Sequence, residues 1–264
     1  MEVHGLTAVV LPELVALRGV EQSVYHHADV HDHTLEVLEA AATLERDPAA
    51  LGLGPCSEPV RELLAEPLAD DLTRGGALRW AALLHDAAKP LTQARRSDGR
   101  VTFVGHDTEG ATLARTVLRR LRASERLAAH VAALVAHHLD LGFLVHERPL
   151  SRRAVWRYLR ATAPVSADVT VFTVADRLAT RGRNADAAIA AHLELAQEML
   201  GYAFAEREHG RPAPLVRGDE LVREAGVPPG PALGRILAQL EEDRFAGELS
   251  TREEAFRRAR DLAR

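Results

Sequence analysis

Histidine and aspartate side chains stand at positions where the surrounding apolar pattern predicts a buried residue. The runs "WAALLHD" and "VFTVAD" end in His85, Asp86 and Asp176, and His33 opens the apolar face of "HDHTLEVLEAA". A carboxylate buried among apolar side chains is costly unless a cation compensates it. Imidazole nitrogens and carboxylate oxygens together suit Mn, Fe, Co, Ni, Zn or, less well, Mg. We therefore predict that His33, His85, Asp86 and Asp176 bind a divalent metal ion.

Ordinary packing offers a second interpretation of the same residues. A lone buried histidine is more often a hydrogen-bonded core residue than a ligand, and a buried aspartate is usually paired with an arginine. Arg177 follows Asp176 directly, and Arg79 precedes His85 on the same predicted helix. The metal interpretation gains weight because the candidate ligands come from three separated helical runs.

Lys89, in "HDAAKP", is the single lysine of a chain that otherwise uses arginine. A divalent ion lowers the pKa of its bound water to roughly 7 and so supplies a nucleophile at neutral pH. In-line attack on phosphorus spreads negative charge over the phosphoryl oxygens, so compact positive charge is needed nearby. The ammonium group of a lysine one turn beyond His85 has a flexible stem and can follow that negative charge. We predict Asp86 and Lys89 as catalytic residues, with Pro90 ending their helix. The alternative is that Lys89 complements the carbonyl end of its helix, as an arginine does equally well.

Apolar residues recur at spacings of three and four along most of the chain, which predicts helices almost throughout and no strand. The predicted helices span 29–45, 59–71, 77–88, 107–122, 124–138, 151–161, 167–181 and 184–208. Ser124 and Ser151 stand where an N-cap hydroxyl is useful, and a further helix is expected to start near Pro231. We expect an all-α fold with a helical lead at 1–24, a main domain at 25–209 and a small helical tail at 210–264.

Composition limits the class of protein. The 264 residues carry a formal net charge of −5, which argues against a generally basic surface for nucleic acid. One cysteine, Cys56, excludes an internal disulfide. We see no segment that approaches the roughly 20 apolar residues of a membrane span, and no export signal. We therefore expect a cytoplasmic protein without membrane contact.

The series His33, His85-Asp86 and Asp176 resembles the signature of the HD-domain superfamily of metal-dependent phosphohydrolases. Longer blocks, among them "LRWAALLHDAAKP", "VAALVAHHLD" and "PLVRGDELVREAGVPPGPALGRILAQL", are similar to the HD-containing half of bacterial tRNA nucleotidyltransferases, the CCA-adding enzymes. The resemblance implies an HD-domain helical bundle with a small C-terminal tail. We find no match to the Gly-Ser turn and Asp-x-Asp pair of that family's nucleotidyltransferase head. We therefore expect no nucleotide addition by this chain alone.

The resemblance also implies further site residues. Some HD hydrolases bind a second ion through a histidine after the His-Asp pair and another on the next helix. His106, with His137 or His138, occupies the matching places. Successive side chains on a helix point about 100° apart, so only one of the last two is expected to face the site, and we favour His137. One and two ions per chain stay equally open. The predicted substrate-binding residues are Lys89, His26, Arg152 and Arg153.

Two functional hypotheses follow. In the first, the chain is a phosphatase or 2',3'-cyclic phosphodiesterase that uses one or two divalent ions (Mn, Ni, Co, Fe, Zn or Mg) on a nucleotide or RNA-end phosphoester. In the second, it is a tRNA-binding or nucleic-acid-binding module that partners a separate nucleotidyltransferase head, and its metal site is structural. Neither the substrate nor the oligomeric state follows from the sequence.

Overall fold

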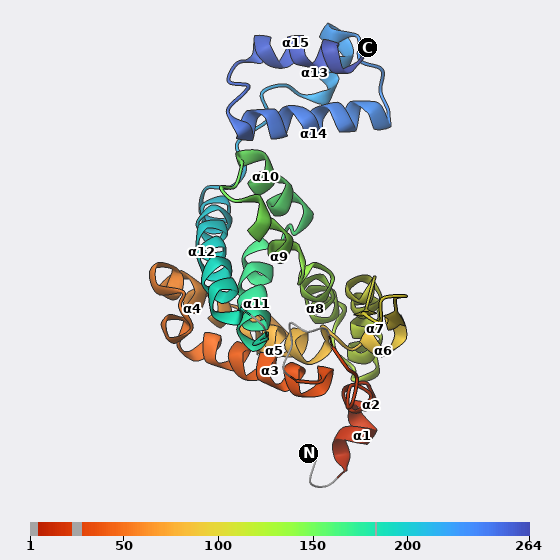
Figure 1. Ribbon diagram of the computed structural model, residues 1–264. Helices are drawn as coiled ribbons and strands as arrows, with labels where there is room; N and C mark the ends of the chain where they lie inside the picture. The colour runs from red at the N-terminus through yellow and green to blue at the C-terminus, as the bar shows by residue number, and fades with distance from the viewer. Residues whose placement is uncertain (1–4, 23–27, 183) are drawn as a thin grey trace. The chain divides into compact units, whose positions relative to one another are not determined.

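The computed structural model describes residues 5–22, 28–182 and 184–264 and is helical almost throughout, which confirms the all-α prediction (Figure 1). Its contacts group the chain into two compact units. The first comprises Met1–His146 with Thr162–Phe204, and the second comprises Glu147–Ala161 with Ala205–Arg264. The domain boundaries expected from the sequence, 1–24, 25–209 and 210–264, stay a prediction.

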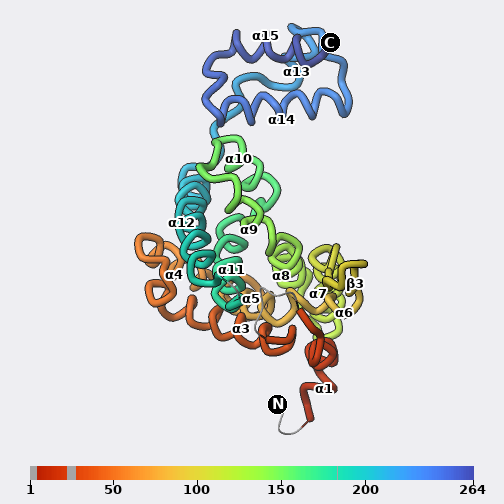
Figure 2. The backbone as a smooth tube through the Cα atoms, viewed as in Figure 1, coloured from red at the N-terminus to blue at the C-terminus, as the bar shows by residue number. Residues whose placement is uncertain are grey.

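Four helices of the first unit meet in its core. Helix α3 packs against α5 and α11, and α8 contacts both α5 and α11 (Figure 2). The α-helices of this unit are α1 (Leu6–Val10), α2 (Pro12–Val15), α3 (Val30–Arg46), α4 (Ser57–Ala65), α5 (Arg74–Leu84), α6 (Lys89–Thr92), α7 (His106–Arg120), α8 (Glu125–His137), α9 (Asp140–Leu144), α11 (Ser166–Ala179) and α12 (Ala185–His209), whose last residues belong to the second unit. The helices that contain or border every predicted metal ligand therefore lie in one unit.

Helix α5 ends earlier than the apolar pattern predicted. It stops at Leu84, and His85 follows as its C-cap, whereas the predicted helix continued to residue 88. Pro90 does not end that helix, because it lies in the first turn of α6, which starts at Lys89. A proline fits the first turn of a helix, where its missing N–H is not needed. His85 and Asp86 consequently lie in the turn between two helices.

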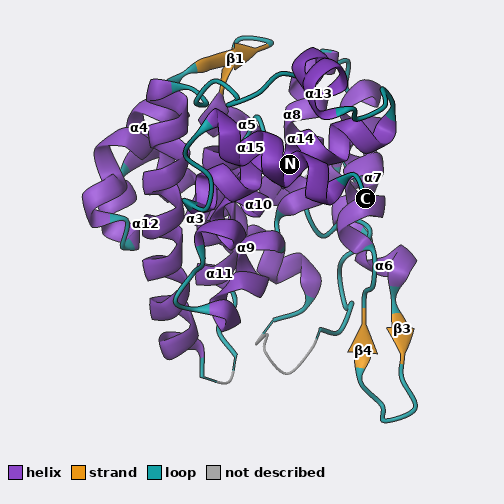
Figure 3. Cartoon of the chain, turned by 90° about the horizontal axis from the view of Figure 1, so that it is seen from above, coloured by secondary structure: helices purple, strands orange, loops and turns teal. Residues whose placement is uncertain are grey.

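The prediction of no strand was wrong. Two antiparallel pairs are present, β1 (Pro67–Ala69) with β2 (Leu72–Thr73) and β3 (Ala94–Arg95) with β4 (Val101–Thr102) (Figure 3). The first pair replaces the end of the helix predicted for 59–71. Asp70 and Asp71 turn the chain there with φ angles of 55° and 58°, a left-handed conformation that aspartate tolerates. Strands of two or three residues are too short to show an alternating pattern.

One segment is long and apolar enough for a membrane span, contrary to the prediction. Glu125–Glu147 has a mean hydropathy of 1.4 over its best 18-residue window. Its main helix is α8, which packs against α5, α7 and α11. A helix in the core of a folded unit is rich in Ala, Val and Leu for that reason, so length and composition alone do not identify a membrane span.

The second unit has its own apolar core and a buried ion-pair network. Its helices are α10 (Arg152–Ala161), α13 (Gly218–Ala225), α14 (Pro231–Ala246) and α15 (Arg252–Leu262). Helix α14 begins at Pro231, as predicted. Asp243 of α14 is 1% exposed and accepts from Arg153 Nη2 at 2.6 Å, Arg258 Nε at 2.8 Å and Gln239 Nε2 at 2.8 Å. This carboxylate joins α10, α14 and α15.

Replacing Asp243 with Ala should destabilise the second unit by about 2–3 kcal/mol, because two arginines lose their shared buried partner. The matched control is Glu248→Gln, since Glu248 also pairs with Arg153 at 2.6 Å but is 58% exposed. That substitution should cost no more than about 0.5 kcal/mol. Urea unfolding followed by the fluorescence of Trp156, in a Trp80→Phe background, measures both. Equal costs for the two variants would contradict the assigned role of Asp243.

His192 of α12 forms a buried polar contact with α11. Its Nε2 lies 3.0 Å from Thr173 Oγ1, and that hydroxyl donates to the carbonyl of Thr170 at 2.8 Å. The hydroxyl hydrogen is therefore used, and Nε2–H of the histidine is the donor. Burial lowers the pKa of His192 from 6.5 to about 4.

Acid should therefore destabilise the first unit through His192. The unfolded chain binds this proton below pH 6.5 and the folded chain only near pH 4, so stability falls as the pH drops between these values. The His192→Gln variant keeps the donor but does not titrate. Its free energy of unfolding should fall by about 2 kcal/mol less than that of the parent chain between pH 7 and pH 5. Urea titrations followed by Trp80 fluorescence, in a Trp156→Phe background, test this, and identical pH dependence would refute it.

Candidate metal centre

Three histidine rings of the first unit are oriented by main-chain carbonyl groups. Each ring donates from Nδ1 to the carbonyl three residues earlier: His85 to Ala82 (2.9 Å), His106 to Phe103 (2.7 Å) and His138 to Val135 (2.6 Å). A carbonyl oxygen only accepts, so Nδ1 holds the hydrogen and each Nε2 of the neutral ring presents a lone pair. An Nδ1–H donated to a carbonyl is the usual support of a metal-binding imidazole.

The local sequence places these rings at helix ends. His85 and His138 are the C-cap residues of α5 and α8, and His106 is the first residue of α7, where the φ of 82° at Gly105 turns the chain into the helix. Gly110 lets α7 approach closely, because a Cβ there would lie 3.2 Å from the carbonyl oxygen of His85. The three rings converge because the ends of three helices meet.

The converging nitrogens face other acceptors. Nε2 of His106 lies 3.2 Å from Nε2 of His138, and Nε2 of His85 lies 3.2 Å from Oδ2 of Asp86. Among the described residues, Nε2 of His85 is buried without a hydrogen-bond partner. Two acceptors at such distances repel unless a proton or a metal ion lies between them. This donor set therefore fits a divalent cation.

The predicted ligands fall into two adjacent groups. In each group one possible ligand atom from each residue lies within 4.8 Å of the others: His33, His85 and Asp176 in the first, and Asp86, His106 and His138 in the second. His33 Nε2 lies 3.0 Å from Asp176 Oδ1 and 3.8 Å from Asp86 Oδ2, so the groups are neighbours. Asp176, with a side chain 20% exposed, is the most accessible of the six. The arrangement offers nitrogen and oxygen ligands for one or two ions.

The preference for His137 was wrong, because the structure places His138 in the cluster. His138 is 3% exposed, whereas the side chain of His137 is 30% exposed and its Nδ1 lies 2.8 Å from Asp140 Oδ2. The buried residues Val131 and Val135 precede His138 by seven and three positions, so His138 continues their helical face. That spacing was the signal in the sequence that identifies the correct histidine.

Lys89 lies inside the cluster. Its Nζ is 2.7 Å from Asp86 Oδ2 and 2.6 Å from Gln22 Oε1, and 5.3 Å from the centre of the Phe103 ring. Gln22 in turn donates from Nε2 to the carbonyl of Asp29, the N-cap of α3, at 3.3 Å. Sequence reasoning missed Gln22, since an isolated glutamine in a predicted lead segment shows no periodic or motif signal.

The electrostatics of the cluster favour a cation. Burial raises the pKa of Asp86, but the adjacent His85 and Lys89 outweigh burial and hold that pKa well below its usual range. Burial lowers the pKa of His85, but Asp86 outweighs burial and raises it, so either a proton or a metal ion fits at Nε2 of His85. The pKa of Asp176 is also lowered, because the hydrogen bond and charge of His33 outweigh burial. Burial and the charge of His85 lower the pKa of His138 from 6.5 to about 4. At neutral pH the cluster thus combines two ionised carboxylates with a neutral imidazole at His138.

Arg152 and Arg153, two of the predicted substrate-binding residues, make their contacts within the second unit. Arg152 donates from Nε to the carbonyl of Phe245 at 2.6 Å, and Arg153 pairs with Asp243. Both arginines belong to the second unit, where they hold α10 against α14 and the residues that follow it. His26 lies outside the described residues. Substrate binding by these three residues stays a prediction.

Comparison with known proteins agrees with this geometry. The HD domain family model matches residues 30–181. The chain is 32% identical over 256 residues to the A-adding tRNA nucleotidyltransferase of Deinococcus radiodurans, which covers 97% of this chain and 51% of that protein. It is 34% identical over 259 residues to the CC-adding tRNA nucleotidyltransferase of Thermus thermophilus, covering 97% and 50%. The chain spans about half the length of these curated relatives.

A further relative matches about half of the chain. A Multifunctional CCA protein of Actinobacillus pleuropneumoniae is 29% identical over 147 residues, which cover 55% of this chain and 29% of that protein. The family match includes His33, His85, Asp86, His106, His138 and Asp176, the six residues that form the cluster. The chain therefore belongs to the HD-domain family.

Proposed function

We propose that this chain is a metal-dependent phosphohydrolase that acts on a phosphomonoester or 2',3'-cyclic phosphodiester of a nucleotide or an RNA end. The observation that carries the proposal is the set of imidazole lone pairs, fixed by main-chain carbonyls, that faces two ionised carboxylates in one buried cluster. Membership of the HD-domain family supports the same chemistry.

The residues have separate roles in this proposal. His33, His85 and Asp176 would hold one divalent ion, and Asp86, His106 and His138 would hold a second. A divalent ion supplies an activated water at neutral pH and neutralises charge on a phosphoryl group. The carbonyl partners of the three histidines keep their lone pairs directed into the cluster.

Lys89 supplies a positive charge beside the phosphoryl group. Its ammonium group is already within 2.7 Å of Asp86, so it lies where negative charge develops during phosphoryl transfer. Gln22, in the segment before α3, accepts a hydrogen bond from the same ammonium group and so limits its position. The exposed edge at Asp176 is the side from which a phosphoester reaches the cluster.

The comparisons favour a second candidate function. The two relatives that match 97% of this chain are tRNA nucleotidyltransferases, which act on tRNA as their names state. In this alternative the chain binds tRNA or another nucleic acid beside a separate nucleotidyltransferase head, and the metal cluster is structural. The two functions differ in their response to chelators, because tRNA binding by such a module survives metal removal whereas hydrolysis does not.

Protein loaded with Mn or Ni should hydrolyse p-nitrophenyl phosphate or 2',3'-cyclic AMP, and EDTA should abolish the activity. Asp86→Ala should lower kcat/KM at least about 100-fold and reduce the bound metal measured by elemental analysis, because a carboxylate ligand is lost. Asp140→Ala is the control, since Asp140 contacts only the partly exposed His137 among these histidines. If metal-loaded protein binds tRNA but leaves a broad phosphoester panel unchanged, the hydrolase proposal fails.

Substitution of Lys89 should separate catalysis from metal binding. Lys89→Ala should lower kcat about 100-fold while the metal content is retained, because the charge that stabilises the transition state is lost and no ligand is removed. Lys89→Arg tests the helix-end alternative, since an arginine serves a helix terminus equally well. Full activity in Lys89→Arg, with a matching loss of thermal stability in Lys89→Ala, would assign Lys89 a structural role.

A further inference from the structure

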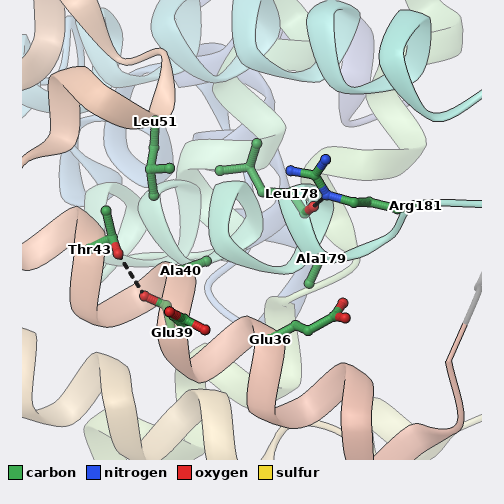
Figure 4. A pocket seen from close by; sticks show the side chains of 8 residues that line it. All are labelled: Glu36, Glu39, Ala40, Thr43, Leu51, Leu178, Ala179 and Arg181. Carbon is green, nitrogen blue, oxygen red and sulfur yellow. Dashed lines mark hydrogen bonds between the residues drawn. The ribbon is translucent and has the colours of Figure 1, made fainter.

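A cavity of about 260 Å³ lies between α3 and the C-terminal end of α11 (Figure 4). Polar and apolar side chains share its lining, which includes Glu36, Glu39, Ala40, Leu51, Leu178 and Arg181. All of these residues belong to the first unit. The volume is just below the range of pockets that hold a whole small-molecule ligand, so the cavity suits part of a larger molecule.

The cavity begins beside the candidate metal centre. Glu36 follows His33 by one helical turn on α3, and Ala179, another lining residue, follows Asp176 by one turn on α11. Side chains three positions apart on a helix are neighbours. His33 and Asp176 do not line the cavity, but they touch each other at 3.0 Å, so the two helices bring this side of the cavity to within one turn of the candidate metal centre. The same Asp176 is the most accessible of the six cluster residues.

The lining defines the chemistry of the occupant. Two carboxylates accept hydrogen bonds and repel a phosphate group, so the cavity suits neutral donors such as hydroxyl and amino groups. Ala40, Leu51 and Leu178 add apolar surface for a ring. Arg181 donates from Nε to the carbonyl of Leu178 at 3.1 Å, which fixes its guanidinium group at the end of α11. A nucleoside combines hydroxyl and amino donors with a flat apolar body.

We infer that this cavity binds the nucleoside part of the substrate while its phosphoryl group lies at the metal cluster. The inference rests on the proposed phosphohydrolase function and adds to it a preference for nucleotides over simple phosphate esters. The carboxylates of Glu36 and Glu39 accept from ribose hydroxyls or from amino groups of the base, and the apolar wall contacts the ring.

A cavity-filling variant tests the inference. Ala40→Leu should raise KM for adenosine 5'-monophosphate about tenfold or more and leave kcat/KM for p-nitrophenyl phosphate unchanged. Glu36→Gln and Glu39→Gln should each weaken nucleotide binding in the same selective way. The matched control is Ala42→Leu, the same substitution on the same helix at a residue that is not among those lining the cavity. Equal effects of Ala40→Leu on both substrates, or none on either, would overturn the inference.

Substrate analogues distinguish the two kinds of donor. A preference for ribose over 2'-deoxyribose nucleotides that Glu36→Gln or Glu39→Gln removes would assign the carboxylates to the sugar. Weak use of ribose 5-phosphate with no ribose preference would assign them to the base. Equal use of ribose 5-phosphate, nucleotide and p-nitrophenyl phosphate would contradict a nucleoside site.

Binding measurements keep this result separate from the proposed activity. Equilibrium dialysis of labelled adenosine against the metal-free and metal-loaded protein measures occupancy of the cavity without turnover. Adenosine binding that Ala40→Leu removes and Ala42→Leu retains supports the cavity even if no phosphoester is hydrolysed. Absence of adenosine binding together with normal hydrolysis of p-nitrophenyl phosphate would reject the nucleoside site and leave the hydrolase proposal intact.

Discussion

The structure of the first unit depends on a close contact between groups that repel one another without a cation. Nε2 atoms of His106 and His138 lie 3.2 Å apart, and Asp86 lies beside them in the same buried space. The carbonyl oxygens that accept from Nδ1 prevent the rings from resolving this repulsion by exchanging tautomers. The ends of α5, α7 and α8 must therefore meet around positive charge.

Lys89 supplies positive charge to the same space. Its ammonium group contacts Asp86 and is held by Gln22, which also binds the start of α3. The lead segment before α3 is thus connected to the turn after α5, although the two are far apart in the sequence. Helix α3 provides His33, so one chain of contacts links the lysine, its glutamine and a candidate metal ligand. The position of the Lys89 ammonium group and the position of the candidate ligand His33 are therefore coupled in this fold.

The two units use different physical means for their stability. The first surrounds a polar cluster with packed helices, whereas the second joins α10, α14 and α15 through the carboxylate of Asp243. Every residue of the metal cluster and of the adjoining cavity belongs to the first unit. Arg153, which the sequence suggested for substrate binding, pairs with Asp243 within the second unit. The two units can therefore be perturbed separately by substitution.

The sequence alone determined the helical class and the side chains that are candidate metal ligands. The three-and-four spacing of apolar residues reflects burial of one helix face, and His85, Asp86 and Asp176 stood out because they interrupt such faces. The short strands escaped prediction because two or three residues form no recognisable period. The choice of His138 was available from its spacing to Val135, but the prediction favoured His137.

Only the tertiary structure decided which distant groups meet. The contacts of Lys89 with Gln22, of His33 with Asp176 and of His106 with His138 join segments 67, 143 and 32 residues apart. Such distances depend on how helix ends pack against one another, and no local pattern records that packing. The sequence specified which side chains could bind a cation, because polar residues at positions of a buried helix face stand out. The fold brought their lone pairs together, because only the packing of the helices sets the direction in which each side chain points.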